Sequence, residues 1–335
     1  MSVAGSARAA PTVELELRER LIPLFGADIA IERLALLAGG ASKEAWALDL
    51  RTPQGKRELL VRRAGGGVIH KETLSLEDEH RLLEVAFAAG VRVPKPFGYL
   101  GEIAGRPAFV SERVSGETIG RRIVQRPDLA DARAVLPTQM AEELAKIHAI
   151  PAERVPFLGG SGARDVLGRL TEEVDSLGDA HPPIELGLSW ATRQAPERSE
   201  TVVLHGDLRV GNLAVTAMGL GHVLDWEFGH RGDPAEDVAW PLVRAWRFGV
   251  DELHLGGIGE VEPYLERYNV LTGRHITLAS LGYWEIVGNL KWAIGALTQS
   301  RRHLSGQQRS VELAVLGRLA AEMEFELLHL LERAG

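Results

Sequence analysis

The chain has 335 residues, of which 45% are hydrophobic and 25% are charged, as is typical of a globular protein rather than a disordered one. Its formal net charge is −8, so it lacks the basic excess that neutralises nucleic-acid phosphates, and we expect no nucleic-acid partner. It has no cysteine, which excludes disulfides, cysteine-ligated metals and thiol nucleophiles. The sequence has neither a recognisable signal peptide nor an apolar run long enough to span a membrane. We therefore expect a cytoplasmic protein without a membrane partner, and its length predicts two domains or lobes.

The first third of the chain is predicted to form a five-stranded antiparallel sheet with one flanking helix. Residues 1–14 are small and polar, as in a loose tail. Apolar residues at near-helical spacing predict a short helix over 14–25, and a second helix over 74–89 ends at Gly90. Strands are predicted at 31–37, 45–50, 57–62, 97–100 and 107–114.

After Gly116 the pattern becomes mainly helical. Helices are predicted at 136–150, 238–248, 261–271, 279–299 and 308–331, with short strands at 201–204, 213–215 and 221–224. The sequence therefore predicts an α+β chain with a small antiparallel-sheet lobe over 1–113 and a larger, mainly helical lobe over 114–335.

One stretch carries most of the chemical information. Asp207 lies in His205-Gly206-Asp207, five residues before Asn212, and Asp225 follows Asp207 by eighteen residues. Phosphoryl transfer needs a carboxylate that orients an attacking hydroxyl, with a carboxamide and a second carboxylate that hold magnesium. A turn or a solvated strand end would explain either half of the pattern alone. Average residue usage, however, produces the pattern His-Gly-Asp-x4-Asn in only about one chain in a thousand.

With these motifs, followed by Gly232-Asp233-Pro234-x2-Asp237, the sequence resembles the aminoglycoside phosphotransferase family, a small-molecule branch of the bilobal protein-kinase-like fold. The resemblance implies that Asp207 is the catalytic base and that Asn212 and Asp225 bind Mg²⁺. It implies that Glu227 is an acidic position that binds metal directly or through water. It also implies that Asp237 hydrogen-bonds the catalytic loop, although a charge at a helix N-terminus is the alternative.

Arg209 occupies the place where protein kinases have a lysine near the transferred phosphate. It is a candidate catalytic residue that neutralises developing charge, and a plain surface arginine is the alternative.

The nucleotide-binding half carries weaker signals. The turn Gly39-Gly40-Ala41-Ser42 joins two predicted strands and is a candidate for covering phosphates with backbone amides. Arg62 stands where the kinase strand has its phosphate-binding lysine, and Glu79 in the following helix is its expected partner. By analogy with the kinase hinge, the carbonyl of Glu112 and the amide of Val114 are expected to bind adenine.

These features predict an ATP-dependent phosphotransferase that acts on a hydroxyl of a small molecule, with ATP and Mg²⁺ as cofactors. The alternatives are an aminoglycoside kinase and a catalytically silent nucleotide-binding pseudoenzyme. A protein kinase is disfavoured, because the Asp-Phe-Gly and Ala-Pro-Glu landmarks are missing. The sequence leaves a homodimer and the choice between ATP and GTP open.

The acceptor is predicted from charge. A site for polycationic aminoglycosides needs clustered carboxylates, whereas the helices expected to line the acceptor site are rich in cations. These are Arg244, Arg247, Lys291, Arg301 and Arg302, beside tryptophans that include Trp240 and Trp246 and with Glu285 as the notable acidic neighbour. We therefore expect a neutral or anionic, partly apolar hydroxy compound, such as a hydroxy acid or its thioester, with a sugar or an antibiotic as the alternative. This resembles the branch of the family associated with acyl-CoA metabolism.

Overall fold

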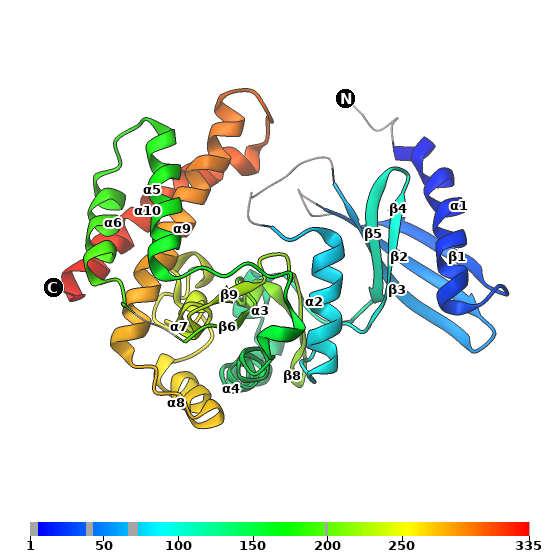
Figure 1. Ribbon diagram of the computed structural model, residues 1–335, viewed down its shortest axis with the longest axis horizontal. Coiled ribbons are helices and arrows are strands. Elements are labelled where there is room, and N and C mark those ends of the chain that lie inside the picture. Colours follow the sequence, from blue (N-terminus) through cyan, green and yellow to red (C-terminus); the bar gives the residue numbers. More distant parts are fainter. Residues whose placement is uncertain (1–5, 38–42, 66–72, 198–199, 335) are drawn as a thin grey trace. The chain divides into compact units, whose positions relative to one another are not determined.

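The computed structural model describes residues 6–37, 43–65, 73–197 and 200–334 (Figure 1). The chain divides into two compact units. The first consists of Met1–Ser115 and Leu224–Gly229, and the second of Gly116–Val223 and His230–Gly335. The assignment of 1–113 to nucleotide binding and of 114–335 to catalysis stays a prediction, to which the structure adds that Leu224–Gly229 belongs with the first unit.

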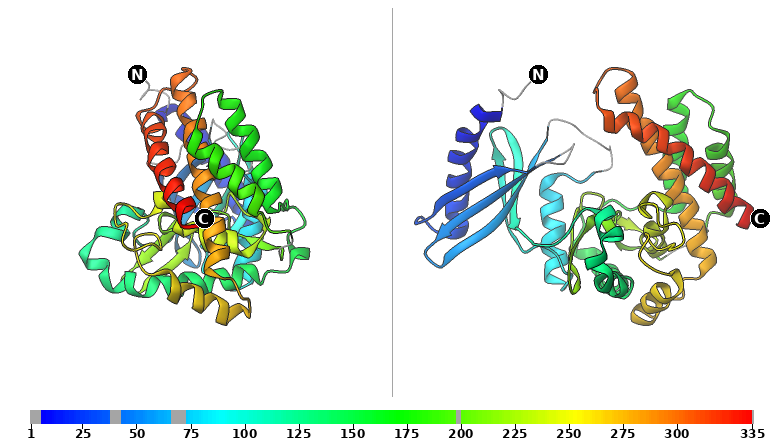
Figure 2. Two further views of the ribbon diagram at one scale, coloured as in Figure 1. Left: turned by 90° about the vertical axis from the view of Figure 1, so that its left-hand side faces the viewer. Right: turned by 180° about the vertical axis from the view of Figure 1, so that it is seen from behind.

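The first unit is built on the predicted five-stranded antiparallel sheet, with the strand order β1-β2-β3-β5-β4. The strands are β1 (Ala30–Leu36), β2 (Lys43–Thr52), β3 (Gly55–Ala64), β4 (Pro96–Ile103) and β5 (Arg106–Glu112). Helices α1 (Ser6–Phe25) and α2 (Leu76–Ala88) lie on opposite faces of this sheet (Figures 1 and 2).

The alternation of side chains along β3 decides which residues reach each helix. Leu59 and Val61 are buried in one apolar core with Leu17 and Leu21 of α1. Because successive side chains point to opposite faces, Arg62 projects toward α2. The phosphate-binding candidate is thus on the same face as the helix that carries its expected partner.

Helix α1 begins earlier than the sequence predicts, whereas α2 lies where a helix is predicted. The chain before residue 14 is not a loose tail throughout, because α1 already begins at Ser6. Its first residues are small and rich in alanine, the strongest helix former. The helix predicted over 74–89 is present as α2, and Ser75 caps it by accepting a hydrogen bond from the Asp78 amide at 3.1 Å.

The second unit combines a helical scaffold with two short antiparallel strand pairs, β6 with β9 and β7 with β8. The helices are α3 (Gly120–Gln125), α4 (Ala130–His148), α5 (Ala163–Leu177), α6 (Pro182–Gln194), α7 (Pro234–Ala239), α8 (Val261–Thr272), α9 (Leu278–Leu304) and α10 (Val311–Ala334). The strands are β6 (Val202–Leu204), β7 (Leu213–Thr216), β8 (Gly219–Val223) and β9 (His230–Gly232). In the described part of the chain, no helix combines the length and hydropathy that crossing a membrane requires.

The prediction of a helix over 238–248 is wrong. Helix α7 ends at Ala239, and two short 3₁₀ turns, Trp240–Leu242 and Arg244–Trp246, follow it. Pro241 explains the break, because it has no amide hydrogen to donate and its ring clashes with the preceding turn of an α-helix. The indoles of Trp240 and Trp246 are therefore presented from turns.

Candidate active site

The loop that carries Asp207 leaves the buried strand β6 and is held by one carboxylate. Asp237 in α7 is completely buried and accepts the backbone N–H of His205 at 2.6 Å and that of Gly206 at 2.8 Å. His148 Nε2 lies 3.3 Å from the same carboxylate. A single side chain thus fixes two consecutive peptide units just before Asp207. Asp237 is engaged with the loop and is not merely a charge at a helix terminus.

Asp237 remains ionised in this environment. Burial favours its neutral form, but the hydrogen bond and charge of His148, with the charge and backbone N–H of His205, outweigh burial and hold the pKa of Asp237 below its usual value. An ionised carboxylate accepts hydrogen bonds more strongly than a neutral acid does.

Asp207 is itself largely buried and accepts hydrogen bonds on both carboxylate oxygens. Asn212 Nδ2 donates to Oδ2 at 2.6 Å and to the Asp207 carbonyl oxygen at 2.9 Å. Oδ1 accepts from Trp240 Nε1 at 2.6 Å and from Arg209 Nε at 3.1 Å. The structure therefore brings together Asp207, Asn212 and Arg209 of the predicted set and adds Trp240, which the sequence suggests only as one of the tryptophans near the acceptor.

Arg209 is held in place by an aromatic ring. Its guanidinium carbon lies 4.2 Å from the centre of a ring of Trp246, a geometry that stabilises a cation through the face of the ring. With its Nε hydrogen-bonded to Asp207, Arg209 is part of the site and is not a plain surface arginine.

The hairpin β7–β8 links the loop to the second acidic motif. Leu213 pairs with Val223 in this hairpin, so Asn212 directly precedes the paired strands and Asp225 comes two residues after them. Asp225 belongs to the first unit and has a φ of 58°, a left-handed conformation that is uncommon outside glycine and concentrates at functional sites.

Within the first unit, four predicted residues form one ionic cluster. Arg62 Nη2 lies 2.5 Å from Asp225 Oδ1, and Arg62 Nη1 lies 3.8 Å from the expected partner Glu79. Burial disfavours the charge of Arg62, but Asp225 and Glu79 outweigh this cost and raise its pKa. Glu227 joins the cluster through Lys43, whose ammonium lies 2.8 Å from it and also contacts Glu79.

Lys43 is a residue that sequence reasoning missed. It follows the predicted phosphate turn directly and begins β2. Its position next to that turn was a usable signal, but only the folded sheet shows that its side chain reaches the carboxylates on α2 and on the Leu224–Gly229 segment.

The remaining nucleotide-binding candidates are less informative. Gly39, Gly40, Ala41 and Ser42 lie outside the described residues. Glu112 ends β5, where its amide donates to the Lys95 carbonyl at 2.8 Å. Val114 follows two residues later, and the adenine contacts of both residues stay a prediction.

The cationic acceptor wall expected from the sequence is wrong for its arginines. Arg247 is 3% exposed and ion-paired with Glu285 at 3.0 Å and with Glu326 at 3.1 Å. The other three are also engaged: Arg244 with Asp251 and Glu326, Arg301 with Asp179, and Arg302 with Gln299 and Gln308. Counts along the sequence do not show how Arg247 is neutralised, because Glu285 and Glu326 lie 38 and 79 residues away from it and come close only in the folded structure.

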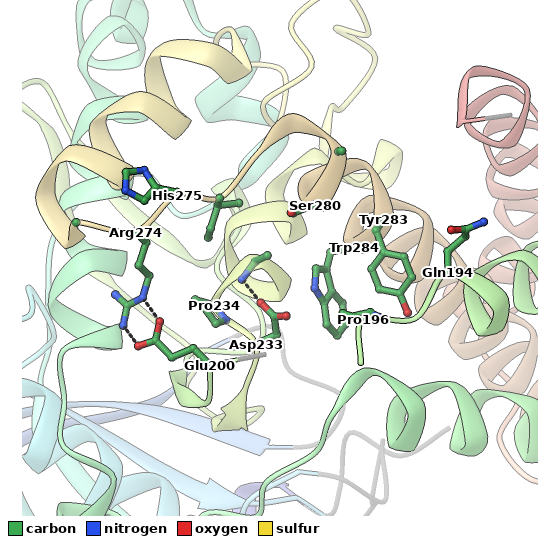
Figure 3. Close-up of a pocket in the computed structure, with 14 residues that line it drawn as sticks. Gln194, Pro196, Glu200, Asp233, Pro234, Arg274, His275, Ser280, Tyr283 and Trp284 are labelled. Carbon is green, nitrogen blue, oxygen red and sulfur yellow. Dashed lines mark hydrogen bonds and ion pairs between the residues drawn. The ribbon is translucent and has the colours of Figure 1, made fainter. Parts of the chain in front are cut away.

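A pocket of about 640 Å³ occurs elsewhere in the second unit (Figure 3). Its wall includes Trp284 and the ion pair between Arg274 and Glu200, with a distance of 2.5 Å from Nη2 to Oε1. Asp207 is not among its lining residues, so it is separate from the hydrogen-bonded group around Asp207.

Solved structures share the fold. A Ralstonia eutropha protein described as an aminoglycoside phosphotransferase aligns over 96% of this chain and 98% of its own, with a TM-score of 0.75 and 20% identity. A thermostable aminoglycoside phosphotransferase mutant in complex with AMP-PNP and hygromycin B aligns over 94% of this chain and 98% of its own, with a TM-score of 0.64 and 16% identity. These likenesses show the protein-kinase-like fold.

Curated relatives match most of this chain but are much longer. Acyl-CoA dehydrogenase family member 10 of Mus musculus is 25% identical over 295 residues, which are 80% of this chain and 26% of the relative. Acyl-CoA dehydrogenase family member 11 of Homo sapiens is 25% identical over 305 residues, which are 85% of this chain and 38% of the relative. The chain thus spans well under half the length of these relatives.

A family model described as "Phosphotransferase enzyme family" matches residues 33–274, which is well over half of the chain. The match includes the loop around Asp207, the hairpin after it and the acidic motif at Asp225. The chain therefore belongs to the phosphotransferase enzyme family and has the protein-kinase-like fold.

Proposed function

We propose that this protein is a small-molecule kinase, which transfers the γ-phosphate of ATP to a hydroxyl of its substrate with Asp207 as the base. The observation that carries the proposal is the loop geometry. Asp237 holds the backbone before Asp207, and three donors orient the Asp207 carboxylate. A carboxylate fixed in this way can orient an acceptor hydroxyl and take its proton.

The donor chemistry of two residues fits a magnesium ion, because Asn212 and Asp225 carry the oxygen atoms that Mg²⁺ prefers as ligands. We assign the metal to these two residues, with Glu227 contacting it directly or through water. The bound ion would neutralise charge on the nucleotide phosphates.

The chain's own groups then divide the work. The turn at 39–42 and Arg62 would bind the phosphates, Glu79 would position Arg62, and the backbone of Glu112 and Val114 would bind adenine. Asp207 would take the hydroxyl proton, and Arg209 would stabilise the charge that develops on the transferred group.

Two substitutions test these roles. Asp207→Asn should lower the transfer rate by about 10²- to 10⁴-fold and leave Mg-nucleotide affinity nearly unchanged, because the base contacts the acceptor. Asp225→Asn should weaken Mg-nucleotide binding, measured by titration calorimetry. Asp251→Asn is the control, because Asp251 is an exposed carboxylate that pairs with Arg244. Normal turnover by the Asp207 variant would contradict the assignment of the base.

For the acceptor, we propose a hydroxy acid or a hydroxyacyl thioester. The groups that contact Asp207 are an indole, a guanidinium and a carboxamide, so none of them adds the negative charge that a polycation needs. Lys291 lies 5.3 Å from the centre of a Trp240 ring. The names of the curated relatives, acyl-CoA dehydrogenase family members, point to the same acyl chemistry.

Steady-state kinetics test the acceptor. We expect a higher kcat/KM with hydroxyacyl thioesters or free hydroxy acids than with kanamycin or hygromycin B. Efficient phosphorylation of an aminoglycoside, with no activity on the hydroxyacyl compounds, would assign the chain to aminoglycoside kinases instead.

A further inference from the structure

We infer that Trp240 is a positioning residue for the base, which selects the oxygen of Asp207 that receives the acceptor's proton. This inference rests on the proposed function, because it takes Asp207 as the base. It adds a residue from outside the His-Gly-Asp-x4-Asn motif.

The indole of Trp240 is held so that its single donor points at the carboxylate. The side chain is 9% exposed, and Nε1 lies 2.6 Å from Asp207 Oδ1. A ring of Trp246 lies 5.7 Å from a ring of Trp240, and Lys291 Nζ lies 5.3 Å from a ring centre of Trp240. An indole N–H can only donate a hydrogen bond, so Trp240 cannot itself take the proton of the acceptor.

The neighbouring indole shows that the contact is specific. Trp246 Nε1 is buried and has no hydrogen-bond partner among the described residues, although its ring belongs to the same aromatic group. Packing alone therefore does not place an indole N–H on a carboxylate here. The donor of Trp240 is the one that meets Asp207.

The donors are unevenly distributed over the two oxygens of Asp207. Oδ1 accepts from both Trp240 and Arg209, whereas Oδ2 accepts from Asn212. Hydrogen bonds to a carboxylate oxygen reduce its ability to accept a further proton. Oδ2 is thus the oxygen that takes the proton as the acceptor O–H bond breaks. The acceptor oxygen forms its bond to the γ-phosphorus, the bond from that phosphorus to the β,γ-bridging oxygen breaks, and ADP leaves.

The segment from Asp237 to Trp240 contacts both the backbone before Asp207 and the Asp207 side chain. Asp237 in α7 accepts the backbone amides before Asp207, and Trp240, three residues later, donates to the side chain of Asp207. The amide of Trp240 itself donates to the Glu236 carbonyl, which fixes the turn at the end of α7. Backbone and carboxylate of Asp207 are therefore oriented from one element.

The test separates the N–H donor from the shape of the ring. Trp240→Phe, and benzothienylalanine incorporated at position 240, both remove the donor, and benzothienylalanine keeps the bicyclic shape. We expect both to lower kcat by about 10- to 100-fold, as for one lost hydrogen bond to a charged group, with KM for both substrates changed less than about threefold. Trp190→Phe is the control, because Trp190 in α6 packs on Tyr283 in α9 and not on the base.

A wild-type kcat with benzothienylalanine at position 240 would overturn the inference, since shape alone would then suffice. So would an effect confined to KM. If these variants are fully active while Asp207→Asn is inactive, the inference fails and the proposed function stands. Normal turnover by Asp207→Asn would remove the proposed function itself.

Discussion

Replacing Asp237 by alanine should destabilise the second unit more than the loss of any exposed carboxylate. Asp237 is completely buried and accepts the amides of His205 and Gly206 at 2.6 and 2.8 Å. Alanine leaves both amides without this partner, and each unsatisfied buried donor costs about 1–3 kcal/mol. The expected loss in the free energy of unfolding is therefore about 2–6 kcal/mol.

Urea denaturation followed by circular dichroism measures this loss. The matched control is Asp233→Ala, at the start of the same helix, where the carboxylate accepts the Ala235 amide at 2.8 Å as an N-cap. Losing an N-cap costs about 1 kcal/mol. If Asp237→Ala costs no more than Asp233→Ala, the loop is not held by Asp237 and the reasoning fails.

Three further outcomes are expected. The pKa of Asp237 is lowered in the folded state. The contribution of this carboxylate to stability is therefore present above the unfolded pKa of about 3.9 and is lost as pH falls through the folded value. Urea midpoints measured from pH 7 to 3 should fall less steeply for Asp237→Asn than for the wild type. Gly257→Ala should lower the free energy of unfolding by about 2 kcal/mol or more, because φ is +72° and a Cβ would overlap the Arg247 carbonyl oxygen. Gly273→Ala, with φ +68° and open space around the Cβ, should lower it by about 1 kcal/mol. Equal losses in urea denaturation would contradict the overlap. Arg62→Met should weaken Mg-nucleotide binding in calorimetry by about tenfold or more, whereas the exposed Arg51→Met should not, and equal affinities would argue against Arg62 as a phosphate ligand.

Much of the fold was predictable because its signals are local. The five strands of the first unit alternate apolar and polar residues or carry dense apolar runs, and the sheet confirms them within a few residues of the predicted bounds. The prediction of a helix over 238–248 is wrong because apolar periodicity continues past Pro241, where the helix ends. The early start of α1 could not be predicted from periodicity, because its first residues are small and carry no apolar stripe.

The residues of the candidate site fall into two groups. Asp207, Asn212 and Asp225 could be named from the sequence alone, because a loop and a hairpin fix their spacing and such spacing is rare. Lys43 could not, because its importance lies in its contact with the distant Glu79. Trp240 could be named only as a tryptophan near the acceptor, because its contact with Asp207 depends on the fold.

For the charged residues, too, the sequence determines one part of their behaviour and the tertiary structure another. The sequence determined that the region around 240–302 is rich in arginine and tryptophan, and hence that its surface could bind an anion. Only tertiary structure decided that Arg247 is neutralised by Glu285 and Glu326, on helices 38 and 79 residues away, whereas Arg209 is turned toward Asp207. The physical reason is that a sequence specifies how many charges there are and how they are spaced along the chain. Their interaction energy, however, depends on separation in space and on burial, which only the packing of the helices determines.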